Sequence, residues 1–70
     1  MKQINKKITI AGTTYQNDDL VLAKCIKFII VRKQWYTLKN GDFTFDLLTG
    51  TVNFLTITLF VNDTIQIMYK

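Results

Sequence analysis

Alternation of apolar and polar residues is the clearest pattern in the second half of the chain. Phe43, Phe45 and Leu47 are each separated by one polar residue. Successive side chains of a strand point to opposite faces, so this spacing is typical of a strand with one buried face. We therefore predict a half-buried strand over residues 43–48.

The next segment, residues 51–61, follows a Thr-Gly turn and changes the phase of its alternation. Val52 and Phe54 share one parity, whereas the apolar residues from Leu55 onward take the other. One added residue would return both halves to the same buried face, and a β-bulge supplies such a residue. We predict a bulge or sharp bend near Phe54 and Leu55.

A last strand is predicted after an Asn-Asp turn, because Ile65, Ile67 and Tyr69 again alternate with other residues. Residues 43–70 are therefore expected to form a three-stranded meander.

Asn40-Gly41 is the strongest turn signal in the chain. Both central positions of a type I′ turn have positive φ, which Asn and Gly tolerate best. We expect this turn to pair residues 35–38 with residues 43–45. At the amino-terminal end, Ile8 and Ile10 predict another half-buried strand.

Residues 18–33 fit two periodicities. As a helix, the segment has aspartates that could cap its first turn. As a strand, it has Ile26, Phe28 and Ile30 on one face and a β-branched run that lowers helix propensity. We favour the strand.

The fold class predicted from this strand is all-β: a small antiparallel barrel of five to six strands, or a strongly bent sheet, of the SH3-like or OB-like type. The alternative is an α+β fold with one helix, at about residues 18–33, packed on a four-stranded antiparallel sheet. Neither shape class implies a function.

Composition supports one small packed domain over residues 1–70. Hydrophobic residues make up 49% of the chain and charged residues 20%, which excludes intrinsic disorder. The basic start has no secretory pattern, and the longest uncharged stretch, 47–62, is too short and too polar for a spanning helix. We expect a cytoplasmic protein without a membrane span.

The residue inventory argues against catalysis. The chain has no histidine and no glutamate, and most of its five aspartates lie at predicted turns. Cys25, the single cysteine, is expected to be an inert buried residue, and no glycine-rich phosphate loop is present. We therefore predict a non-enzymatic protein that needs no cofactor and no metal.

Charge is distributed unevenly along the chain. Residues 1–39 contain eight of the nine Lys and Arg residues and two of the five aspartates, a balance of +6. Residues 40–70 have a balance of −2, from one lysine and three aspartates. A small domain polarised in this way can present a positive face to phosphates or to an acidic protein.

Residues 24–39 interleave cations with aromatic rings, which single-stranded nucleic acid binding requires because cations contact the backbone and rings stack on bases. The predicted nucleic-acid-binding residues are Lys24, Lys27, Arg32, Lys33, Trp35, Tyr36 and Lys39. Lys6 and Lys7 are expected nearby. The same residues also fit a simpler interpretation, with the tryptophan in the core and the lysines as solvated positions that keep a sheet soluble.

The leading functional hypothesis is therefore a small binding module for nucleic acid, with single strands favoured. One alternative is a small viral, phage or mobile-element protein that binds and modulates a host protein, suggested by its size and its Ile-, Lys-, Asn- and Thr-rich composition. Another is a structural subunit of a larger assembly, for which oligomer formation is expected.

Overall fold

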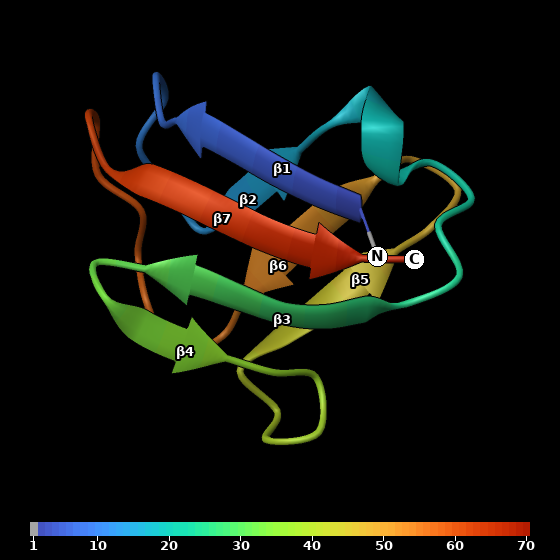
Figure 1. The fold of residues 1–70 in the computed structure, drawn as a ribbon. Coiled ribbons are helices and arrows are strands. Elements are labelled where there is room, and N and C mark those ends of the chain that lie inside the picture. The colour runs from blue at the N-terminus through green and yellow to red at the C-terminus, as the bar shows by residue number, and fades with distance from the viewer. Residues whose placement is uncertain (1) are drawn as a thin grey trace.

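A computed structural model describes residues 2–70, which form seven short strands and one turn of 3₁₀ helix (Figure 1). The elements, in chain order, are β1 (Lys2–Lys7), β2 (Thr14–Gln16), η1 (Asp18–Leu20), β3 (Ile26–Val31), β4 (Gln34–Tyr36), β5 (Phe43–Asp46), β6 (Thr51–Phe54) and β7 (Thr64–Tyr69).

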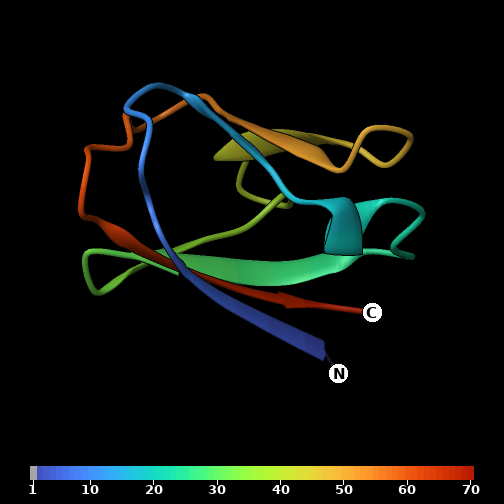
Figure 2. The same cartoon turned by 90° about the horizontal axis from the view of Figure 1, so that it is seen from above.

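The strands form two antiparallel sheets. One has the order β1-β7-β3-β4 and the other the order β2-β6-β5, and Figure 2 shows them as two layers. The all-β prediction is therefore confirmed, although the described residues form seven strands rather than five or six, and the two sheets are not closed into one barrel.

The segment 18–33 contains the six-residue strand β3 and no α-helix, so the helical alternative is wrong. Only Asp18–Leu20 is helical, as a single 3₁₀ turn whose Asp19 N–H donates to Asn17 Oδ1 at 2.9 Å. The β-branched run at the end of β3 gains hydrogen-bonded neighbours on both sides, β7 and β4, which a helix could not provide.

The core lies between the two sheets. From the four-stranded sheet, Ile29 and Val31 of β3 lie opposite Ile67 and Ile65 of β7, and all four are fully buried. The three-stranded sheet and the connecting segments complete the core with Phe43, Val52, Phe54, Leu20 and Leu59. The apolar face predicted for the last strand is therefore confirmed.

A bulge in β3 changes which of its residues face outward. Ile26 pairs with Tyr69 and Phe28 pairs with Met68, so Lys27 is the additional residue on the β3 side. Ile26 and Ile29 are consequently both buried although they are three positions apart. Lys27 and Phe28, between them, lie on the opposite side of the strand.

The predicted hairpin at Asn40-Gly41 is wrong, because β4 and β5 belong to different sheets. A turn does form here, but only Gly41 of this pair has a positive φ, +74°. The Thr37 N–H donates to Asp42 Oδ2 at 3.1 Å, and the Asp42 N–H donates to the Thr37 carbonyl at 3.2 Å. These bonds close a wider loop, from which the chain enters the second sheet.

The predicted meander is also wrong. β5 and β6 pair as expected across a turn that ends at Gly50, but β7 lies in the other sheet between β1 and β3. The reason is the bend after Phe54, which was predicted and is confirmed: β6 ends there and the chain bends at Leu55. Leu59 then forms a bridge with Gly12 and is buried, whereas Leu55 is exposed.

The amino-terminal strand lies earlier than predicted. β1 ends at Lys7, and its inward residue Ile4 lies opposite Ile67. Ile8 is buried just after the strand, where its N–H donates to the Asp63 carbonyl at 2.7 Å. Ile10 is 81% exposed, so its predicted place on a buried face is wrong.

No helix within residues 2–70 is long and apolar enough to cross a membrane.

The buried contact between β3 and β7 predicts a strong dependence of stability on Ile67. Ile67→Ala should lower the free energy of unfolding by about 2–5 kcal/mol, because it removes buried methyl groups and leaves a cavity. Ile10→Ala, the same substitution at an exposed position, should change it by less than about 0.5 kcal/mol. Urea denaturation measures both, and equal effects would contradict the core described above.

Candidate functional site

The outer face of the four-stranded sheet is the surface opposite the core. Because Ile4, Ile29, Ile65 and Ile67 point inward, residues of the opposite parity point outward. This outer face consists of Gln3, Asn5, Lys7, Phe28, Ile30, Trp35, Thr64, Gln66 and Met68. None of the five aspartates of the chain is part of it.

Two aromatic rings lie side by side on this outer face. The ring centroids of Phe28 and Trp35 are 4.5 Å apart, with an angle of 36° between the planes. Trp35 is 63% exposed, so its alternative placement in the core is wrong. The exposed indole, supported by a phenyl ring, offers a flat surface on which another ring can stack.

Tyr36 lies on the other side of β4. Its ring makes an edge contact with Phe54, at a centroid distance of 6.2 Å, and packs against the core. Of the two aromatic residues predicted for the interface, the structure thus places Trp35 on the outer face and Tyr36 beneath it.

The predicted cations fall into separate groups. Lys27 lies beside Phe28 at the bulge, whereas Arg32 and Lys33 form the turn between β3 and β4. Lys24 precedes β3 at its far end, where its N–H donates to the Lys70 carbonyl at 2.7 Å. Six strand residues at about 3.3 Å each separate that end from the turn by roughly 20 Å.

The remaining lysines also differ in position. Lys39 lies in the loop between β4 and β5, outside the strands that form the outer face, whereas Lys7 is one of the outer-face residues. Lys6 has the opposite parity on β1 and is exposed. Lys7, Lys27 and Lys33 are therefore the lysines on or beside the outer face.

The turn between β3 and β4 is strained. Arg32 and Lys33 have φ values of +50° and +67°, and the flanking residues Val31 and Gln34 are paired. A two-residue turn with two positive φ values ordinarily contains Asn and Gly. For residues with long side chains this conformation costs roughly 1–2 kcal/mol each.

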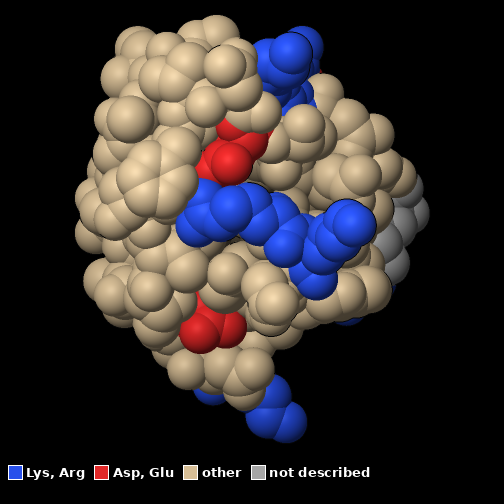
Figure 3. Space-filling model, turned by 90° about the vertical axis from the view of Figure 1, so that its left-hand side faces the viewer, with Lys and Arg blue, Asp and Glu red and all other residues tan. Residues whose placement is uncertain are grey.

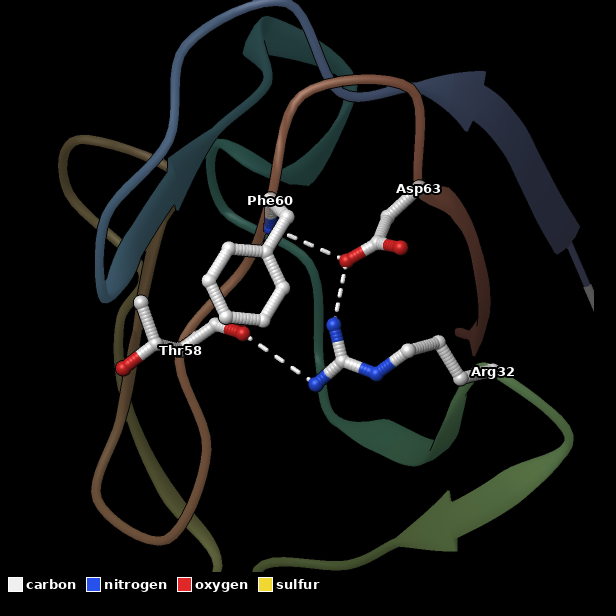
Figure 4. Close-up of polar contacts among 4 residues, drawn as sticks. All are labelled: Arg32, Thr58, Phe60 and Asp63. Atoms are coloured by element: carbon white, nitrogen blue, oxygen red, sulfur yellow. Dashed lines mark hydrogen bonds and ion pairs between the residues drawn. The ribbon is translucent and has the colours of Figure 1, made fainter.

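A set of contacts, which we term the Arg32 latch, holds this turn (Figure 4). The Arg32 guanidinium donates from Nη1 to Asp63 Oδ2 and from Nη2 to the Thr58 carbonyl, the latter at 3.1 Å. Its central carbon lies 5.1 Å from the centroid of the Phe60 ring. Asp63 Oδ2 also accepts from the Phe60 N–H at 2.9 Å. The latch joins the β3–β4 turn to the segment that precedes β7.

A hollow of about 410 Å³ lies between this turn and the turn before β7. It is lined by Arg32, Lys33, Asn62, Asp63, Thr64 and Gln66, with Ile30 of the outer face among them. Figure 3 views the molecule from this end and shows a band of Lys and Arg atoms with aspartate atoms on either side of it. The hollow is thus an open depression, lined mostly by polar residues, that continues onto the outer face.

The described residues include no cluster that suits a metal. Within residues 2–70, no group of three or more His, Cys, Asp or Glu side chains is placed to hold an ion. Cys25 is partly buried, less than predicted, and its carbonyl accepts from the Lys70 N–H at 3.0 Å.

Comparison with known proteins gives no relative: no family model matches the chain, and neither the curated proteins nor the solved structures contain a match.

Three features of this surface are absent from the sequence-based prediction. The Arg32-Lys33 turn lacks the residues that signal a turn. Gln66 and Met68 alternate in sequence with Ile65, Ile67 and Tyr69, and this alternation could have placed them on a common surface. The hollow depends on two turns that are thirty residues apart in sequence, at 32–33 and 62–63, and no local pattern could reveal it.

The latch predicts that Asp63 stabilises the fold. Asp63→Ala should lower the free energy of unfolding by about 1–3 kcal/mol, because it removes the acceptor for both Arg32 and the Phe60 N–H. Asp19→Ala, at an exposed aspartate in η1, should have an effect below about 0.5 kcal/mol. If chemical denaturation gave Asp63→Ala no larger effect than Asp19→Ala, the latch would not stabilise the fold.

Proposed function

We propose that the protein is a non-enzymatic binding module that engages single-stranded nucleic acid through the outer face of its four-stranded sheet. The observation that carries this proposal is the pair of adjacent rings, Phe28 and Trp35, with the indole 63% exposed on a face without carboxylates. Unpaired bases gain about 1–3 kcal/mol each by stacking on such rings.

The surroundings of the two rings supply the other interactions that a nucleic acid strand needs. Lys27 and Lys33 lie near opposite ends of β3, where they can contact separate phosphates of one strand. The side-chain amide of Asn5, which lies opposite Gln66 across β1 and β7, can donate to or accept from base edges. Stacking on the face of a sheet requires unpaired bases, which favours single strands over duplexes.

The fold is in keeping with this activity. OB-like barrels bind oligonucleotides on the face of a small antiparallel sheet. As part of the same proposal, we assign this protein a fold of the SH3-like or OB-like type. We further propose that the protein is cytoplasmic and that its outer face contacts single-stranded nucleic acid there directly.

A protein partner is the second candidate, favoured by a group of exposed leucines at the end of the molecule remote from the Arg32 latch. Leu22 and Leu48 are 69% and 74% exposed, and the Leu22 N–H donates to the carbonyl of the half-exposed Leu47 at 2.8 Å. Exposed apolar groups of this kind suit a host protein or a neighbouring subunit. Light scattering of Leu48→Lys beside the wild type tests self-assembly: association lost in the variant supports a subunit, and a monomeric wild type contradicts it.

The stacking role of Trp35 predicts a selective loss of binding. Trp35→Ala should weaken binding of a labelled single-stranded oligonucleotide roughly 5- to 150-fold, the equivalent of one stacked base. Fluorescence anisotropy at low salt measures the affinity, and urea denaturation checks that the variant is folded.

Leu48→Ala is the matched control, because it truncates an apolar residue that is at least as exposed as Trp35 and lies away from the outer face. It should bind as the wild type does. Unchanged affinity in a folded Trp35→Ala variant would exclude the outer face as the binding surface.

A further inference from the structure

The hollow beside the β3–β4 turn adjoins the aromatic pair. Ile30, one of its lining residues, lies directly opposite Trp35 on β4 and opposite Gln66 on β7. A group held in the hollow beside Ile30 would therefore be next to the cross-strand neighbour of Trp35. This is the arrangement that a nucleotide strand needs when a phosphate is held at one point and a neighbouring base stacks at another.

The side chains that line the hollow are mainly donors. Lys33 contributes an ammonium group, Asn62 and Gln66 contribute amide N–H groups, and Thr64 contributes a hydroxyl. The single carboxylate, Asp63, is paired with Arg32 through the latch. With one negative and two positive charges, the lining carries a net charge of +1, so it suits an anion with several acceptor oxygens.

Three of the four non-glycine residues with a positive φ within residues 2–70 lie on the two walls of the hollow. Arg32 and Lys33 on one wall and Asn62 on the other have positive φ, the last at +77°. Glycine at these positions would adopt a positive φ without strain, but it would lack the hydrogen-bond donors of the present side chains. Strained conformations tend to occur where they position functional groups.

We propose that the hollow is a phosphate subsite, which holds one backbone phosphate of a single strand while the adjoining base stacks on Trp35. This inference rests on the proposed function and assigns the polar half of the same site. Lys33, Asn62, Thr64 and Gln66 contact the phosphate oxygens, and Arg32 holds the turn in place through the latch.

Two probes of equal charge separate the phosphate subsite from the stacking surface. One is an eight-residue thymidine oligonucleotide, and the other is an abasic strand with the same number of phosphates. Amide-resolved NMR titrations at low salt should show that the abasic strand shifts the signals of Asn62, Thr64 and Gln66 but leaves the Trp35 indole N–H signal unchanged. The thymidine strand should shift both sets.

The other outcomes distinguish the two proposals. If the thymidine strand shifts the Trp35 indole signal and neither probe shifts the signals of the hollow, the phosphate subsite is wrong and the stacking surface stands. If the thymidine strand shifts neither set, the proposed function itself is wrong. Shifts from the abasic strand that are confined to other lysines would also overturn the subsite.

Lys33→Gly tests the subsite by substitution, because glycine readily adopts the φ of +67° found at this position. This variant should bind the thymidine strand about fivefold more weakly. The slope of log affinity against log salt should fall by about 0.7, the loss of one phosphate contact. Its unfolding midpoint should not decrease.

Lys70→Ala removes one positive charge beyond the far end of β7 and is the matched control. It should leave the salt slope close to that of the wild type. Equal changes in Lys33→Gly and Lys70→Ala would show that only the total charge matters, and would overturn a phosphate site in the hollow.

Discussion

The pairing of β3 with β7 is the constraint on which the rest of the structure depends. It places Ile29 opposite Ile67 and Val31 opposite Ile65, and these four residues are fully buried against the second sheet. Because strand side chains alternate, burying one parity necessarily exposes the other. The core thus determines which residues form the outer face, and a slip of one residue would exchange the two sets. The bulge at Lys27 adds to this surface, since it turns a cation and a phenyl ring outward together.

The Arg32 latch connects this outer face to the rest of the molecule. It joins the turn after β3 to the turn before β7, which are the two walls of the hollow. An Asn-Gly turn would make the same hairpin with less strain, so the presence of Arg and Lys there is not explained by hairpin geometry alone. The hydrogen bonds of Arg32 to Asp63 and Thr58 explain why an arginine occupies the first position of this turn. Lys33 has no such structural explanation, and the proposed phosphate contact provides one.

The sequence predicted the elements better than their arrangement. Alternation located β5, β6 and β7 and the bend after Phe54, because it reports on local burial. It could not assign strands to sheets. The Asn40-Gly41 turn was predicted to form a tight hairpin, but the bonds between Thr37 and Asp42 close a wider loop that links the two sheets. Sheet membership depends on contacts between distant segments, such as the Gly12–Leu59 bridge.

The same distinction applies to the candidate site. Trp35 and its flanking cations were identified from their composition, but Tyr36 was grouped with Trp35 although neighbours in a strand point to opposite faces. The most direct test of the outer face is the fluorescence of Trp35, the single tryptophan, during titration with a single-stranded oligonucleotide and then its duplex as the salt concentration rises. We predict quenching by the single strand at low salt, reversal by salt and a weaker response to the duplex. Binding of the single strand with no change in Trp35 emission, or no binding at all, would contradict a nucleic-acid site on this face.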